Sequence, residues 1–132
     1  MTRINVVPVT ELCDQHLFAE FRELSRIPNT LVSGKLSPDN TPLEYTLGKG
    51  HVKWAANHLT WLYKRYMMLF DECRGRGYSV TWKWNSQSSE MFPDLWNDYT
   101  PTQEALNLNR GRIQERMPVT PRYHGEKLSK IV

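Results

Sequence analysis

The chain has 132 residues, which is enough for one domain with a single core and too few for two. Its composition, 39% hydrophobic and 23% charged, excludes an intrinsically disordered chain. The sequence has no apolar run of membrane-spanning length and no signal-peptide core, so we expect no membrane partner. Cys13 and Cys73 lack Cys or His neighbours at ligand spacing, which predicts no metal site, reduced thiols and a cytoplasmic location.

The net charge of +3 is modest, but it is unevenly distributed. Bases predominate over residues 47–84 and again from residue 105 onward, whereas residues 90–104 carry only acidic charges. This arrangement predicts one basic face, which would attract a phosphate backbone. The alternative is a protein with a slight surplus of Lys and Arg over its whole surface.

Residues 1–9 are expected to form an extended arm, because Pro8 disfavours a helix there. A first helix is expected over residues 10–27, with Thr10 as its N-cap and Pro28 as its end. Apolar residues recur at helical spacing on one face, which is the pattern of a core-facing helix. That face consists of Cys13, Leu17, Phe21 and Leu24, and the opposite face carries His16, Ala19, Arg22, Glu23 and Arg26.

Residues 28–50 lack a sustained period and are expected to be a loop. The loop ends in Gly48-Lys49-Gly50 directly before a second predicted helix over residues 51–74. Glycines and a lysine at a helix N-terminus form a candidate phosphate-binding site, because free backbone N–H groups and the helix dipole favour an anion. The alternative is that these glycines only turn the chain.

Residues 78–100 are expected to be irregular and to be held on the helices by their aromatic side chains. A third helix is expected from residue 100 to about residue 117, because Thr100, Pro101 and Gln103 match a capping box. Arg112 and Arg116 are four residues apart on it and share a face. The prediction is a single all-α domain over residues 1–132, with three main helices and long irregular loops.

The N-terminus itself is a candidate reactive group. Thr2 is small, so removal of Met1 would leave a free α-amine on Thr2. An α-amine has a pKa near 7.7–8.0, and neighbouring arginines disfavour its charged form. An uncharged amine forms Schiff bases with aldehyde-like carbons.

Three segments closely resemble the pyrimidine-dimer DNA glycosylases with abasic-site lyase activity, the phage endonuclease V type. They are MTRIN, ELCDQHLFAEFRELSR and LGKGHV. The later segments DYTPTQEALNLNRGRIQERM and PRYHGEK resemble the third helix and a shortened form of the Tyr-rich tail of that family. The spacing of the polar residues in the first two segments matches the family without a gap.

The resemblance implies a fold with the N-terminal arm inserted among three helices, and a monomer acting on damaged double-stranded DNA without a metal or cofactor. It implies that the Thr2 amine attacks the damaged nucleotide, with Glu23 as the acid/base residue. Excision then proceeds through a Schiff base to strand cleavage by β-elimination. The residues expected to contact DNA or lesion are Arg3, His16, Arg22, Arg26, Gly48, Lys49, Gly50, Arg112, Arg116, Arg122 and Tyr123.

Two other readings stay open. The tail has fewer aromatic residues than that of the family, so the enzyme could act on a different base lesion. The chain could also be a DNA-binding helical module without catalysis.

Overall fold

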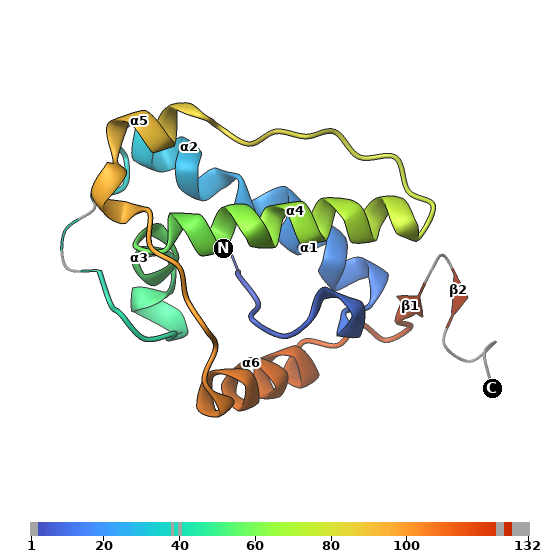
Figure 1. Ribbon diagram of the computed structural model, residues 1–132. Helices are drawn as coiled ribbons and strands as arrows, with labels where there is room; N and C mark the ends of the chain where they lie inside the picture. Colours follow the sequence, from blue (N-terminus) through green and yellow to red (C-terminus); the bar gives the residue numbers. More distant parts are fainter. Residues whose placement is uncertain (1–2, 38, 40, 124–125, 128–132) are drawn as a thin grey trace.

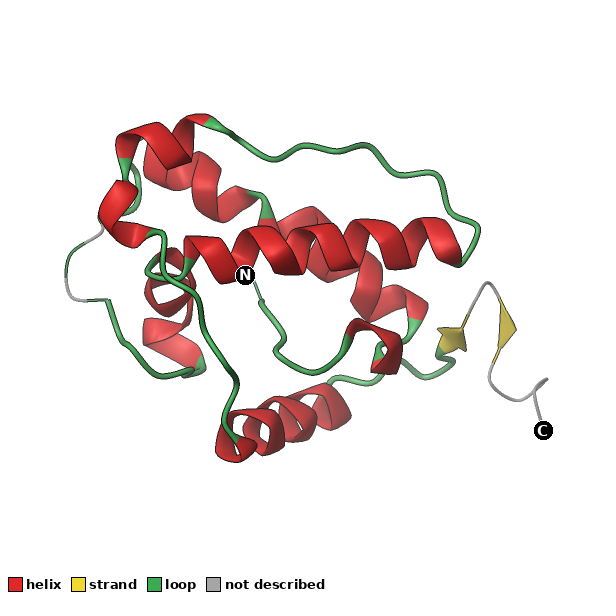
Figure 2. Ribbon diagram, in the orientation of Figure 1, coloured by secondary structure: helices red, strands yellow, loops and turns green. Residues whose placement is uncertain are grey.

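The computed structural model describes residues 3–37, 39, 41–123 and 126–127. The described chain is mostly helical, which confirms the predicted all-α class (Figure 2). The α-helices are α1 (Asp14–Leu24), α2 (Arg26–Val32), α3 (His51–Ala56), α4 (Leu59–Gly75), α5 (Gln87–Met91) and α6 (Gln103–Glu115). The described chain also has three 3₁₀ turns, which are η1 (Val9–Glu11), η2 (Gly48–Gly50) and η3 (Pro93–Leu95). Two short strands, β1 (Arg122–Tyr123) and β2 (Glu126–Lys127), pair antiparallel.

The longest helix, α4, lies at the centre of the fold. Helix α1 packs along α4, and α2 contacts α3 and α5. The N-terminal arm, residues 3–8, runs between the α1–α4 pair and α6 (Figure 1). This arrangement confirms the insertion of the arm among the helices. No helix in the described part of the chain is both long and apolar enough to cross a lipid bilayer.

The first predicted helix is divided into three pieces. Thr10 is not an N-cap, because it lies inside η1, and α1 begins only after Cys13. The apolar face is confirmed, since its four side chains are all buried. Pro28 does not end the helical region, which resumes as α2. It is the third residue of α2, in the first turn, where the missing N–H of a proline costs no helix hydrogen bond.

The second predicted helix is interrupted between α3 and α4. His58 has a non-helical backbone with φ of −131°, and its ring Nδ1 lies 2.7 Å from the Trp54 carbonyl oxygen. That carbonyl would accept the His58 N–H in a continuous helix. Here the Trp54 carbonyl is bonded to the His58 ring and to the Asn57 N–H, while the His58 N–H bonds the Ala55 carbonyl at 3.0 Å. The helix is broken at this point although the apolar pattern of the sequence continues. The expected buried thiols are confirmed, and burial raises the pKa of Cys73 to about 11.

The third helix starts two residues later than predicted. Its N-cap is Thr102, whose hydroxyl accepts the Ala105 N–H at 3.0 Å, and Pro101 precedes the helix. Thr100 and Thr102 are both suitable N-cap residues, and the bond from the Ala105 N–H selects the second. The segment expected to be irregular, 78–100, contains α5 and η3, but its aromatic side chains do pack on the helices as expected.

Candidate active site

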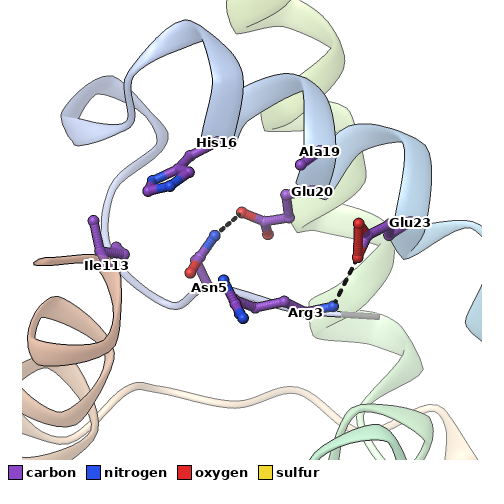
Figure 3. A pocket seen from close by; sticks show the side chains of 7 residues that line it. All are labelled: Arg3, Asn5, His16, Ala19, Glu20, Glu23 and Ile113. Carbon is purple, nitrogen blue, oxygen red and sulfur yellow. Dashed lines mark hydrogen bonds between the residues drawn. The ribbon is translucent and has the colours of Figure 1, made fainter. Parts of the chain in front are cut away.

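The arm meets α1 at two carboxylates on one face of that helix. Glu20 and Glu23 are three residues apart, so both side chains point toward the arm (Figure 3). The Arg3 main-chain N–H donates to Glu23 Oε1 at 3.2 Å, and Asn5 Nδ2 donates to Glu20 Oε1 at 2.9 Å. The chain direction of the arm is therefore fixed, with its N-terminal end at Glu23.

These contacts line a pocket of about 160 Å³. Arg3 and Asn5 of the arm form one wall of the pocket, and Ile113 of α6 closes another. Figure 3 shows His16 and Glu23 at opposite ends of the α1 wall, with the small side chain of Ala19 between them. The complete lining is Arg3, Asn5, His16, Ala19, Glu20, Glu23 and Ile113.

The two carboxylates have different environments. Glu20 is 2% exposed and forms a bidentate ion pair with buried Arg65 of α4, with Nε–Oε2 and Nη2–Oε1 distances of 2.8 and 2.9 Å. Glu23 is half-buried, and among the described residues it forms no ion pair. A carboxylate that is committed to a guanidinium is a structural group, whereas one that remains available can move protons. Glu23 is therefore the candidate acid/base residue of this pocket.

Positive charge acts on the pocket from Arg3 itself and from two arginines of the α6 region. Partial burial, followed by repulsion from Arg112 and Arg116, lowers the pKa of the Arg3 guanidinium, while Glu23 acts in the opposite direction. Arg112 also has a buried Nε with no hydrogen-bond partner in the described structure. A phosphate bound near these arginines would reduce their mutual repulsion.

His16 connects α1 to the end of α6. Its Nε2 lies 3.0 Å from the Arg116 carbonyl oxygen, so Nε2 carries the hydrogen and donates. Its Nδ1 is buried and has no partner in the described part of the chain. The predicted residues Arg3, His16 and Glu23 are thus brought together in one pocket.

Other predicted residues lie outside this pocket. Arg22 lines a second cavity of about 400 Å³ between α1 and the segment that follows α4, with Phe18, Tyr66 and Lys83. Arg26 is exposed at the start of α2. Both residues are exposed, and neither is among the residues that line the pocket of Glu23. Thr2, the predicted nucleophile, lies outside the described residues.

The remaining predicted contacts lie further away. Gly48, Lys49 and Gly50 form η2 at the start of α3, and the first two are exposed. A Cβ on Gly50 would come within 3.1 Å of Thr46 Cγ2, so this glycine permits close packing. Residues of β1 lie beside the N-terminal end of α1, where Gln15 Oε1 accepts the Arg122 N–H at 3.0 Å.

Tyr123, the second residue of β1, also lies beside the N-terminal end of α1. Burial raises its pKa, and the charges that act on it belong to Cys13, Asp14 and Arg76. Asp14 and Glu23 are nine residues apart on α1, roughly 13 Å at the rise of an α-helix. Tyr123 is thus well separated from Glu23, and it is not among the residues that line the pocket.

Several residues of the site were not predicted from the sequence. Glu20 lies between His16 and Glu23 at helical spacing, so the pattern of that face could have identified it. Asn5 follows the predicted reactive end of the arm, but nothing in its sequence context indicates a buried amide. Ile113 and Asn109 come from α6, and only the tertiary structure brings them to the arm.

Most residues of this pocket lie in a segment that matches a known protein family. Residues 1–86 match the model of a protein family described as pyrimidine dimer DNA glycosylase. The matched segment includes the arm and helices α1 to α4, and therefore Arg3, Glu20, Glu23 and Arg65. It ends before α6, which closes the pocket from the other side.

Proposed function

The chain belongs to the pyrimidine dimer DNA glycosylase family, and on that premise we propose that it is a bifunctional DNA repair enzyme that uses the α-amine of Thr2. Family membership makes it a DNA glycosylase with damaged DNA as its substrate. The proposal adds the chemistry: excision through a Schiff base, then strand cleavage by an abasic-site lyase step. It includes double-stranded substrate, a monomeric enzyme and a cytoplasmic location.

One observation carries the proposal, the 3.2 Å hydrogen bond from the Arg3 N–H to Glu23 Oε1. The α-amine of Thr2 is three covalent bonds from that nitrogen. Removal of Met1 would therefore put a free amine within a few ångströms of a half-buried carboxylate, beside a pocket with arginines around it. Neighbouring guanidiniums favour the uncharged, nucleophilic form of an amine.

The proposed reaction begins with attack of the amine nitrogen on the sugar C1′ of the damaged nucleotide. The C1′–N bond to the pyrimidine breaks, and the base leaves with the electron pair and takes up a proton. Loss of a proton from nitrogen and opening of the sugar ring give an imine between the enzyme and C1′. Glu23 would offset the positive charge that develops on the sugar.

The lyase step then uses the same imine. Glu23 would accept the C2′ proton, and the electrons of the C2′–H bond expel the 3′ phosphate, which cuts the strand. Water hydrolyses the imine, so that the amine is restored and an unsaturated aldehyde is released. The pocket volume of about 160 Å³ corresponds to roughly five water molecules, a size that suits one sugar ring.

Phosphate contacts would hold the DNA while this chemistry proceeds. Arg112 and Arg116 repel the Arg3 guanidinium of the pocket, and the exposed Arg22 and Arg26 add positive charge on α1 and α2, which supports this part of the proposal. The proposed DNA contacts are Arg3, His16, Arg22, Arg26, Gly48, Lys49, Gly50, Arg112, Arg116, Arg122 and Tyr123.

Borohydride trapping on duplex DNA with one abasic site tests the central step. The expected result is a covalent adduct on the peptide that begins with Thr2, together with an intact mass that lacks Met1. Intact mass with Met1 retained, or no adduct from protein that lacks Met1, would overturn the Schiff-base proposal and favour a DNA-binding module without catalysis.

Glu23→Gln tests the role of the carboxylate. Loss of general acid/base catalysis costs typically 10²–10⁴-fold in rate, so strand scission should fall by about that factor. DNA affinity should stay within about threefold of wild type, because Gln keeps the acceptor for the Arg3 N–H. Unchanged nicking would remove Glu23 from the mechanism.

The lesion class has its own test, since the tail has fewer aromatic residues than that of the family. Nicking of ultraviolet-irradiated plasmid, without nicking of untreated plasmid, is expected for a pyrimidine-dimer enzyme. Cleavage at abasic sites together with indifference to irradiation would instead indicate a different base lesion.

A further inference from the structure

The main chain of the arm is held by side chains from three other parts of the fold, and not by a neighbouring strand. The Ile4 N–H, Ile4 carbonyl, Val6 N–H, Val7 N–H and Val7 carbonyl groups all bond to buried side chains. Their partners are His51, Tyr45, Asn109 and Arg65. None of these four residues lines the pocket.

His51 is bonded at both ring nitrogens. Its Nε2 accepts the Ile4 N–H at 2.8 Å, and its Nδ1 lies 2.8 Å from the Thr46 carbonyl oxygen. A carbonyl oxygen only accepts, so Nδ1 carries the hydrogen and Nε2 presents its lone pair to the arm. Burial lowers the pKa of His51, which favours this neutral form. The ring is therefore fixed as an acceptor for one particular main-chain N–H.

Asn109 of α6 holds the other end of the arm. Its Oδ1 accepts the N–H groups of Val6 and Val7 at 2.7 and 3.1 Å, and its Nδ2 donates to Asn5 Oδ1 at 2.8 Å. Asn5 in turn donates to Glu20, whose charge is balanced by Arg65. This series of donors and acceptors fixes the orientation of both amides and links α6 to α1 through the arm.

Such contacts determine which residue of the arm lies opposite Glu23. An extended chain advances about 3.3 Å per residue, so a shift of one residue would separate the Arg3 N–H from Glu23 and reverse the side that each residue presents. We propose that His51 and Asn109 are positioning residues that set the register of the arm, so that Arg3 meets Glu23 and the amine of residue 2 reaches the substrate.

The chemical consequence rests on the proposed function, but the register itself does not. Hydrogen bonds are directional, so the acceptors on His51 and Asn109 select particular N–H groups of the arm, whereas apolar contacts such as those of Val6 and Val7 are not directional. Loss of an acceptor for the arm should therefore disturb the Arg3–Glu23 contact, even though neither His51 nor Asn109 touches Arg3 or Glu23 through a hydrogen bond.

Four variants test the proposal. His51→Phe and Asn109→Leu keep approximate shape and remove the acceptors, while His51→Gln keeps an amide oxygen in place of Nε2. His58→Phe is the control, because His58 is also buried and bonds to a carbonyl, but it has no hydrogen bond to residues 3–8 of the arm. All four are compared below their unfolding temperatures.

The first measurement is hydrogen exchange and the chemical shift of the Arg3 amide, by NMR. In His51→Phe and Asn109→Leu, we expect Arg3 amide exchange to accelerate at least tenfold. His51→Gln should recover most of the protection, and His58→Phe should match wild type. An Arg3 amide that is unchanged in both acceptor-deleted variants would overturn the proposal. If His51→Phe does not fold, His51→Gln and Asn109→Leu decide the same question.

The second measurement separates positioning from binding. The single-turnover rate of borohydride trapping on abasic DNA should fall at least tenfold in the acceptor-deleted variants. Affinity for a duplex with a tetrahydrofuran abasic analogue should stay within threefold. Equal losses of affinity and trapping would indicate a general structural role and overturn the inference. If wild type forms no adduct, the amine chemistry fails, and the Arg3 amide alone decides the register.

Discussion

The N-terminal arm and the segment after α4, residues 78–86, both lack regular secondary structure, but they are held in different ways. The arm is held by hydrogen bonds from buried side chains to its main chain. Residues 78–86 also have a main-chain bond of this kind, from the Lys83 N–H to the buried Tyr66 hydroxyl at 3.0 Å, but most of their contacts are between rings. Trp82 packs on Tyr66 and Phe70 with centroids 4.7 and 5.4 Å apart, and Trp84 packs on Tyr63 at 5.2 Å.

The difference matters because the two kinds of contact constrain different quantities. A hydrogen bond to a main-chain N–H fixes one atom within a few tenths of an ångström. Ring contacts accept a range of distances and tilts, so apart from the Lys83 N–H they constrain residues 78–86 less closely than hydrogen bonds constrain the arm. The arm leads to the proposed nucleophile, and the aromatic segment borders an open cavity with Arg22 and Lys83. The more closely constrained of the two segments is therefore the arm, which leads to the amine proposed to bond to the sugar.

The largest expected effect comes from the ion pair beneath the arm. Arg65→Met leaves Glu20 buried without its guanidinium, which should cost about 3–5 kcal/mol in the free energy of unfolding. Urea denaturation measures this cost. The neighbouring change Lys64→Met is the control, because the pair of Lys64 with Asp98 is about half exposed and should cost under about 1 kcal/mol.

A second variant separates the charge from the packing. Glu20→Gln combined with Arg65→Met removes both buried charges, so the double variant should cost much less than the sum of the two single changes. Additive costs would mean that the two residues do not depend on each other. The arm would then depend on its bonds to His51, Tyr45 and Asn109 without a contribution from the ion pair.

A smaller effect is expected from the aromatic segment. Trp84→Ala removes contacts with Tyr63 and Trp96 at a partly exposed position, and should cost about 1–3 kcal/mol. The Arg3 amide should keep its exchange protection, since the arm has other supports. If Trp84→Ala lost that protection, the arm would depend on residues 78–86, and the proposed difference between the two regions would be wrong.

His51 makes the stability of the arm depend on pH. Burial lowers the pKa of His51 in the folded protein, whereas the unfolded chain titrates near 6.5. Below about pH 6.5 the unfolded state therefore binds more protons, and the free energy of unfolding falls as the pH is lowered, by at most about 1.4 kcal/mol per pH unit. His51→Gln lacks this titration. Urea denaturation from pH 8 to pH 5 should show wild type losing stability relative to His51→Gln, and parallel curves would contradict it.

The sequence was most informative where one helix carried the signal. The apolar face of residues 13–24 predicted its buried side correctly, and the polar face led to His16 and Glu23 in the pocket. Boundaries failed where side chains compete with the backbone. The His58 ring bonds the Trp54 carbonyl and divides a continuous apolar pattern into two helices.

The supports of the arm were not predictable in the same way. Asn109 accepts N–H groups from residues more than a hundred positions earlier in the chain, and a single Asn on an exposed-looking helix gives no indication of this. The Gly48-Lys49-Gly50 segment suggested an anion site. The structure adds a role for its neighbour His51, which contacts the arm. Long-range side-chain bonds to the main chain leave no periodic pattern.

The smallest expected effect concerns binding on the side of α1 that faces the aromatic segment. Arg22→Ala should lower the slope of log affinity against log salt by about one, because one phosphate contact is lost. Arg110→Ala is the control: its guanidinium already pairs with Glu11 at 2.9 Å on the surface, and it should leave the slope unchanged. Fluorescence anisotropy over a range of salt concentrations measures both. The trapping rate at saturating enzyme should be unchanged in Arg22→Ala, since Arg22 lies outside the Glu23 pocket. If Arg22→Ala lowered both the salt slope and the trapping rate, the surface beside residues 78–86 would also position the reacting sugar. The proposed difference between the arm and residues 78–86 would then be wrong.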